Sequence, residues 1–189
     1  RARGGMFGYA YVPLSEPPGL WGAYADYMYL DPHSIVHPMR KDLPANLAVM
    51  FNPLGAGFRW AVEIPETRPG DTVLVLGPGQ RGLASIIAAK AAGADTVIVT
   101  GLTRDEAKLR VARELGADHV IDVQQEDVRA RVREITGGRG ADVVVEVSSN
   151  APEPVAEALH YVATGGRIVL AGVKGFKSVP DFLSDLIVV

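Results

Sequence analysis

The chain has 189 residues, of which 48% are hydrophobic and 22% are charged, and its net charge is −3. This mixture is typical of a soluble globular protein, and the lack of a Lys or Arg cluster argues against a nucleic-acid partner. The sequence has no cysteine and no apolar run long enough to span a membrane. We therefore expect a cytoplasmic protein without disulfides and without a membrane partner. The chain begins with Arg1 and stops within an apolar run, which predicts a piece of a longer protein.

The two halves of the sequence differ in composition. Residues 1–70 contain nine of the 13 prolines and five of the six tyrosines. This composition favours loops and short strands, and residues 24–30 are predicted to form one such strand.

From Asp71 onward, apolar runs alternate with amphipathic stretches, as strands alternate with helices in α/β proteins. Strands are predicted at 73–76, 96–100, 119–123, 142–148 and 167–172. Helices are predicted after the first strand, from a capping box at Thr103 and Glu106 to Gly116, over 128–135, and along Val155, Leu159 and Val162 up to Gly165-Gly166. Such alternation requires a parallel sheet with right-handed crossovers and helices on both faces. The predicted fold class is therefore α/β, a Rossmann-type doubly wound parallel sheet.

The turn after the first predicted strand carries Gly77, Gly79 and Gly82, at the G-x-G-x-x-G spacing of dinucleotide-binding proteins. Gly77 permits a tight turn, Gly79 lets the backbone approach a diphosphate, and Gly82 lets helix and strand pack closely. The N–H groups of the new helix, which begins near Gln80 and Arg81, then face the phosphates. The Arg81 side chain either reaches the diphosphate or lies in solvent. A plain tight turn is the alternative, but the strand before and the helix after the glycines favour a dinucleotide site.

The residues after the second predicted strand bear on which dinucleotide binds. In NAD-specific proteins an acidic residue stands there, about 20 residues after the glycine motif. The nineteenth residue after Gly82 is Gly101 (101 − 82 = 19), and no carboxylate stands beside it. Thr103, Arg104 and Lys108 follow, and their donors suit a 2′-phosphate, so the sequence favours NADP over NAD. Alternatively, Thr103 caps the next helix and the two cations are solvated surface charges.

Six short segments stand in a specific order and spacing: Gly22–Tyr27, Pro44–Leu47, Pro53–Ala56, Pro69–Gly79, Ala112–Asp118 and Gly165–Gly172. In them the chain resembles the medium-chain dehydrogenase/reductase family, the zinc-type alcohol dehydrogenase superfamily. The resemblance implies an oxidoreductase that moves a hydride between NADP(H) and an alcohol/carbonyl pair or an activated alkene. It also implies that residues 1–52 are a β-rich remnant of the catalytic domain with a linker, and that residues 53–189 are the cofactor domain, truncated at its C-terminus.

The resemblance assigns further candidate site residues. It implies that Ser148, Gly172 and Val173, at the carboxyl ends of the last two predicted strands, border the nicotinamide ribose and carboxamide; ordinary turns are the alternative. Asn52 stands where zinc-bearing members have an acidic residue or Cys. Because a neutral amide is a poor zinc ligand, no metal site is predicted in this chain, and zinc in the intact protein is left open. Asn52 either touches substrate or a metal-bound water, or it caps the chain before Pro53.

No residue of this chain stands out as a general acid or base, so the catalytic residues are not assigned. His33 and His37 are expected to be ordinary loop residues rather than metal ligands. The alternatives to a zinc-type enzyme are a zinc-independent reductase like the quinone oxidoreductases, favoured by Asn52, a non-catalytic dinucleotide-binding module, and a methyltransferase that uses S-adenosylmethionine. The expected partners are a small-molecule substrate and further copies of the chain, in a dimer or tetramer.

Overall fold

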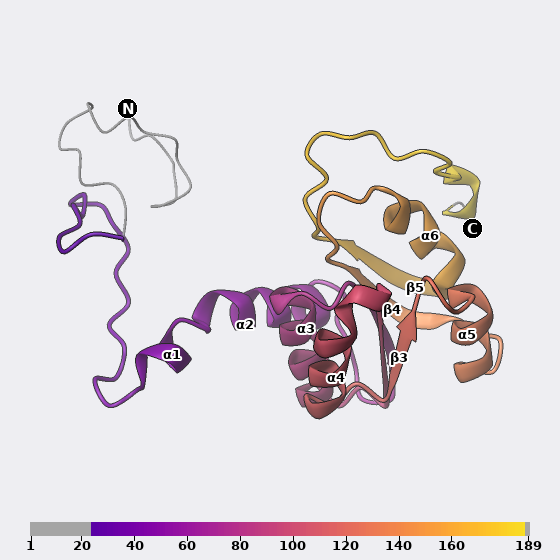
Figure 1. Cartoon of the computed structure of the whole chain (residues 1–189), viewed down its shortest axis with the longest axis horizontal. Coiled ribbons are helices and arrows are strands. Elements are labelled where there is room, and N and C mark those ends of the chain that lie inside the picture. Colours follow the sequence, from indigo (N-terminus) through magenta and orange to yellow (C-terminus); the bar gives the residue numbers. More distant parts are fainter. Residues whose placement is uncertain (1–23, 188–189) are drawn as a thin grey trace. The chain divides into compact units, whose positions relative to one another are not determined.

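The computed structural model describes residues 24–187 (Figure 1). The chain divides into two units, one ending at Leu43 and one beginning at Pro44. In the first unit, residues 24–43 form turns but no helix or strand. The strand predicted over 24–30 is therefore wrong. A strand needs a neighbour to receive its backbone hydrogen bonds, and no strand of the described chain pairs with this segment. Tyr24 and Tyr27 are correspondingly exposed.

The second unit is built on a sheet of five parallel strands in the order β3-β2-β1-β4-β5. The strands are β1 (Thr72–Leu76), β2 (Thr96–Gly101), β3 (His119–Asp122), β4 (Ala141–Glu146) and β5 (Val162–Leu170). This topology confirms the predicted Rossmann-type α/β class. The chain moves from β1 outward to β3 and then crosses to β4 on the other side of β1. Ligands of such sheets bind where the strand order reverses, which here is the carboxyl edge between β1 and β4.

Helices cover both faces of the sheet, as the alternating pattern predicts. The helical segments of the second unit are α1 (Ala45–Ala48), α2 (Phe51–Phe58), η1 (Arg59–Glu63), α3 (Gln80–Ala91), η2 (Thr103–Asp105), α4 (Glu106–Glu114), α5 (Val128–Ile135), α6 (Glu153–Tyr161) and η3 (Ser184–Leu186). Val73 and Val75 of β1 pack with α3, α4 and η1 on one face, whereas Leu74 and Leu76 pack with α5 and α6 on the other. Successive strand residues face opposite ways, so one apolar run fills two cores. No helix within residues 24–187 is long and apolar enough to cross a membrane.

The fifth strand begins earlier than the sequence predicts. The helix α6 ends at Tyr161 and β5 follows at once, so Val162 belongs to the strand and not to the helical stripe. Gly165-Gly166 consequently lies inside β5 instead of ending the helix. The pairing of β5 with β4 is irregular near its start, and Gly165, at φ +75°, supplies a backbone conformation that suits such a bulge.

The second unit also begins before the predicted domain boundary. A division between residues 52 and 53 would cut α2, which runs unbroken from Phe51 to Phe58 and packs on α3. A Cβ atom at Gly57 would lie 2.5 Å from the carbonyl carbon of Ala84, so the two helices are in close contact at this glycine. The structural unit therefore starts at Pro44. The assignment of the preceding residues to a catalytic domain stays a prediction.

Candidate dinucleotide site

The amino end of α3 presents unpaired backbone donors at the carboxyl edge of β1. The first hydrogen bond inside the helix runs from the N–H of Leu83 to the carbonyl of Gly79, at 2.8 Å. The N–H groups of Gln80, Arg81 and Gly82 therefore have no helix carbonyl to receive them. The helix has 12 residues, so the positive end of its dipole adds to these donors and favours an anion.

The three glycines of the motif show three different geometries. Gly77 has φ +111°, which opens the tight turn after β1. A Cβ atom at Gly82 would lie 2.0 Å from the carbonyl oxygen of Gly77, so the helix approaches the strand as closely as glycine allows. A Cβ atom at Gly79 would meet nothing within 4 Å. Packing within the protein therefore does not explain Gly79, whereas a ligand in front of the helix would.

The side chain of Arg81 packs against an aromatic ring of the same unit. Its guanidinium carbon lies 5.3 Å from the centre of the Trp60 ring, an attractive cation–π arrangement. Its Nε is buried and has no hydrogen-bond partner among residues 24–187. The Arg81 side chain thus joins α3 to η1, and the backbone N–H of Arg81 is one of the donors at the amino end of α3.

At the end of β2, Gly101 stands where an acidic residue would mark NAD. A Cβ atom at Gly101 would lie 2.9 Å from Cγ of Pro78 and 3.0 Å from Cδ2 of Leu109. The space that a carboxylate side chain would need is therefore filled by the protein itself. The side chains of Pro78 and Leu109 thus leave no room for an acidic residue at position 101.

Thr103 is held by the last residue of β3 and by a residue of the loop that follows it. Its hydroxyl donates to Oδ2 of Asp122 at 2.6 Å, and its N–H donates to Oε1 of Gln124 at 3.1 Å. The predicted capping box of Thr103 and Glu106 is therefore wrong: the hydroxyl is already engaged, and Asp105 accepts from the N–H of Leu102 instead, at 3.3 Å. The sequence analysis did not identify Asp122 as a site residue, because it is far from the glycine motif in sequence. It could have been found from the pairing of β3 with β2, which places Asp122 beside Gly101.

The two cations predicted to bind a 2′-phosphate are placed differently. Lys108 Nζ lies 2.5 Å from Oδ1 of Asp105, and this hydrogen bond lowers the pKa of the Asp105 carboxyl below its usual value. Lys108 is therefore already paired. Arg104 is exposed and makes no hydrogen bond or ion pair with the residues that the structure describes. Of the two, Arg104 is the cation free to meet a phosphate.

Ser148, Gly172 and Lys174 lie beyond the carboxyl ends of β4 and β5, together with Glu146, the last residue of β4. Lys174 Nζ is 2.7 Å from Oε1 of Glu146 and 3.1 Å from Oγ of Ser148. Gly172 has no room for a side chain, because a Cβ atom there would lie 2.0 Å from the carbonyl oxygen of Ser148. Val173 is exposed. The sequence analysis did not identify Glu146 and Lys174 as site residues. The one sign of them in the sequence is that the charged residue Glu146 follows the apolar residues 143–145.

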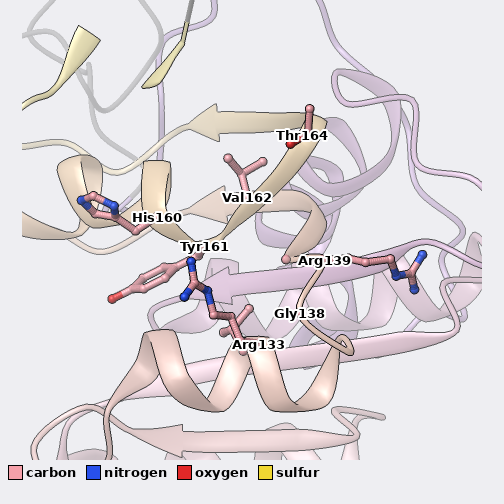
Figure 2. Close-up of a pocket in the computed structure, with 9 residues that line it drawn as sticks. Arg133, Gly138, Arg139, His160, Tyr161, Val162 and Thr164 are labelled. Atoms are coloured by element: carbon pink, nitrogen blue, oxygen red, sulfur yellow. The ribbon is translucent and has the colours of Figure 1, made fainter. Parts of the chain in front are cut away.

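Two hollows lie at opposite edges of the sheet. One, of about 410 Å³, is lined by the apolar side chains of Leu102, Val123 and Ala151, by residues 126–129 at the start of α5, and by residues of α6 from Glu153 to Tyr161; four carboxylates are among this lining. Because Leu102 follows β2 and Val123 follows β3, this hollow is at the carboxyl edge, next to the candidate site. The other, of about 200 Å³, lies at the amino ends of β4 and β5. Figure 2 shows that the guanidinium groups of Arg133 and Arg139 there point in different directions, so they do not converge on one ligand.

Asn52 is an exposed residue in the first turn of α2. Met50 precedes this helix at the capping position and no side chain caps it, so the prediction that Asn52 caps the chain is wrong.

The Nδ1 atom of His33 lies 3.1 Å from the Asp31 carboxylate. Within residues 24–187 no group of three or more His, Cys, Asp or Glu residues is placed to hold a metal ion.

With the site's geometry established, the family follows from comparison with known proteins. Residues 82–188, more than half of the chain, match the family described as zinc-binding dehydrogenase. The chain belongs to this family. A probable alcohol dehydrogenase of Mycobacterium tuberculosis is 50% identical over 182 residues, which are 95% of this chain and 49% of the relative. Sorbitol dehydrogenase of Bacillus subtilis is 32% identical over 175 residues, which are 91% of this chain and 48% of the relative. The chain thus spans about half the length of the curated relatives it matches.

Solved structures of alcohol dehydrogenases share the fold. An alcohol dehydrogenase of Thermotoga maritima, 29% identical, superposes with a TM-score of 0.78 over 92% of this chain and 49% of that one. The alcohol dehydrogenase of Thermus sp. ATN1, 30% identical, gives a TM-score of 0.71 over 80% of this chain and 43% of that one. The family resemblance that the six sequence segments carry is therefore confirmed.

Proposed function

We propose that this chain binds a nicotinamide dinucleotide, and that the protein is an oxidoreductase transferring a hydride between NADP(H) and an alcohol/carbonyl pair or an activated alkene. One observation carries the proposal: the N–H groups of Gln80, Arg81 and Gly82 have no helix carbonyl to receive them, and within residues 24–187 only the chain neighbours of Gly79 come within 4 Å of its missing Cβ. The cofactor, when bound, supplies the ring that gives or takes the hydride. The chain holds the phosphates and orients that ring. The dehydrogenases among its relatives support this activity.

The carboxyl edge of the sheet offers a place for each part of the cofactor. The diphosphate would lie at the amino end of α3. The adenine ring would enter the hollow beside Leu102 and Val123, whose side chains supply an apolar surface. The nicotinamide end would lie over Ser148 and Gly172, beyond β4 and β5.

We propose NADP rather than NAD as the cofactor. Gly101 supplies no carboxylate to the adenosine ribose, and packing by Pro78 and Leu109 excludes one. Arg104 is exposed and unpaired among the described residues, so its guanidinium is available to a 2′-phosphate. Asp122, which accepts from Thr103, opposes such a phosphate through its negative charge.

Calorimetric titration of the 189-residue chain with NADPH and with NADH tests both proposals. We expect NADPH to bind more tightly, and Arg104→Ala to weaken NADPH by roughly tenfold while leaving NADH unchanged, since one charge-assisted hydrogen bond is worth about 1.5–3 kcal/mol. Arg110→Ala, which alters another exposed arginine farther along α4, is the matched control. Tighter binding of NADH would overturn the NADP assignment. Binding of neither dinucleotide by the folded chain would overturn the proposed function.

A zinc-independent reductase of the quinone oxidoreductase type is the second candidate, and Asn52 favours it. Its neutral amide stands where a zinc-bearing member would have an acidic residue or Cys. Metal analysis of the intact protein separates the two enzymes, and hydride exchange with a panel of aldehydes and enones separates both from a non-catalytic binding module. Stoichiometric zinc would overturn the zinc-independent reading.

The wider predictions also stay proposals. We propose a small-molecule substrate, a catalytic domain to which residues 1–52 belong, and a homo-oligomer in the cytoplasm. The outer edge of β5 is unpaired among the described residues, and Leu186 and Ile187 are exposed; each feature supports an interface on the second unit. Size-exclusion chromatography with light scattering tests the oligomeric state.

A further inference from the structure

A carboxylate is buried at the point where β4 ends. Glu146 is the last residue of β4 and its side chain is 0% exposed. It pairs in register with Leu76, the last residue of β1, so it stands at the edge where the strand order reverses. A buried carboxylate needs a compensating charge and hydrogen bonds, since its transfer from water is costly.

Lys174, from the loop after β5, supplies that charge. Its side chain is 12% exposed and its Nζ lies 2.7 Å from Oε1 of Glu146. Within residues 24–187 this is the one ion pair in which both side chains are largely buried. Such a pair is weak evidence of stability, because apolar residues of similar volume often stabilise a protein equally well.

The same ammonium group joins two loops. Lys174 Nζ donates to the carbonyl oxygen of Ser148 at 2.6 Å, and the N–H of Ser148 donates to Glu146 at 2.9 Å. The Ser148 hydroxyl also donates to the Glu146 carboxylate. Lys174 therefore links the loops after β4 and β5, beside the hydrogen bonds that the N–H of Asn150 and the Nζ of Lys177 make between the same loops. Gly172 lies in this contact, because a Cβ atom there would be 2.8 Å from Lys174 Nζ.

The cluster also touches the phosphate turn. A Cβ atom at Gly77 would lie 3.3 Å from the backbone of Ser148, so the loop after β4 rests against the turn after β1. Oε2 of Glu146 is buried without a hydrogen-bond partner in the described part of the chain. A pair selected for stability alone would satisfy both carboxylate oxygens. The arrangement instead orders the backbone at the edge where the ligand is proposed to lie.

We propose that Lys174 is a positioning residue: by neutralising Glu146 and binding the Ser148 carbonyl, it holds the loops after β4 and β5 in the arrangement that receives the nicotinamide end of the cofactor. This inference rests on the proposed function. It predicts that Lys174 affects the nicotinamide half of the ligand and leaves the adenosine half untouched.

Selective ligands test the inference on the full chain. Wild type and Lys174→Met are titrated with NADPH and with adenosine 2′,5′-bisphosphate, which lacks the nicotinamide half. NADH and ADP serve as the equivalent pair if NADH binds more tightly. We expect Lys174→Met to weaken the reduced cofactor by roughly tenfold or more, the usual effect of losing charged hydrogen bonds, and to leave the adenosine half unchanged. Lys174→Arg should restore part of the loss.

Lys177→Met is the matched control. Lys177 lies on the same loop and is exposed, and its Nζ donates to the Asn150 carbonyl at 2.7 Å without touching Glu146. It should bind both ligands as wild type does. The fluorescence of the reduced nicotinamide ring gives a second readout, because ring emission changes with its surroundings: at saturating ligand, Lys174→Met should lose the change that wild type shows.

If Lys174→Met unfolds the chain, the double variant Glu146→Leu with Lys174→Met removes both buried charges and should recover the Tm while the reduced cofactor still binds weakly. Equal loss of both ligands in a folded variant would show that the lysine only supports the fold, and unchanged NADPH binding would show that it has no positioning role. Either result overturns the inference and leaves the proposed function standing. Binding of neither ligand by wild type overturns both.

Discussion

Alanine substitutions at Gly79 and Gly82 should affect different properties, although the two glycines are only three residues apart: the first should lower dinucleotide affinity and the second should lower stability. Gly79 has φ −71° and ψ 176°, which any residue adopts, and a Cβ atom there meets nothing within 4 Å. Gly79→Ala should therefore leave the free energy of unfolding nearly unchanged. Its methyl group would occupy the space proposed for the diphosphate, and loss of one or two charged hydrogen bonds, at about 1.5–3 kcal/mol each, would weaken dinucleotide binding at least tenfold.

Gly82→Ala should act on the fold instead. Its Cβ would lie 2.0 Å from the carbonyl oxygen of Gly77 and 3.1 Å from the carbonyl carbon, so the backbone of helix or turn must shift. Overpacking of this kind costs about 1–3 kcal/mol, and each kcal/mol lowers the Tm of a chain of this size by about 2–4 °C.

Thermal denaturation followed by circular dichroism, with calorimetric titration of NADPH on the same samples, separates the two effects. The expected pattern is an unchanged Tm with lost affinity for Gly79→Ala, and a lowered Tm for Gly82→Ala. Wild-type affinity in Gly79→Ala would refute the reasoning, because it would mean that no ligand approaches the backbone at this residue.

Three further changes test the surroundings of the site. Gly101→Asp should lower the free energy of unfolding by about 1–3 kcal/mol in urea denaturation, because its Cβ meets Pro78 and Leu109; undiminished stability with a gain of NADH affinity would contradict this. Asp122→Asn removes a negative charge beside Thr103 and should strengthen NADPH binding by up to about fivefold, close to 1 kcal/mol, with NADH unaffected. Lys108→Met should cost about 0.2–1 kcal/mol of stability at pH 7. Because the pKa of Asp105 is lowered in the folded chain, its stabilising effect is present above the unfolded value of about 3.9 and is lost as the pH falls through the folded value. Wild type and Lys108→Met should therefore converge in acid, and a constant difference down to pH 2 would show that the ion pair is not the cause.

The strands, the glycine turn and the family could be predicted because each depends on short stretches of sequence. The run from Val73 to Leu76 is apolar at every position, which suits a central strand buried on both faces, and the structure places it there. The bounds of the last strand could not be predicted in the same way. Glycine is read as a helix stop, yet Gly165 lies in a bulge whose presence depends on how β5 pairs with β4.

Several side chains that shape the candidate site could not be found along one stretch of sequence, for a physical reason. Parallel strands bring their carboxyl ends to one edge of the sheet, so residues far apart in the chain meet there. Thr103 and Asp122 are 19 residues apart, and Glu146 and Lys174 are 28 apart, yet each pair is in hydrogen-bond contact. A search for one acidic residue after β2 therefore looks along a single strand, whereas the carboxylate beside that strand end belongs to β3.

The same geometry limits what any one position can do for specificity. Placing a carboxylate at residue 101 requires space that Pro78 and Leu109 fill, so a change of cofactor would need at least one neighbouring substitution as well. The Asp122 carboxylate already lies close by, but it accepts a hydrogen bond from the Thr103 hydroxyl. Its negative charge therefore acts on a ligand either through Thr103 or from a position next to it. Cofactor preference in this chain is consequently a property of three adjacent strand ends and their loops, and a variant that alters one residue should shift the balance between NADP and NAD by about tenfold at most.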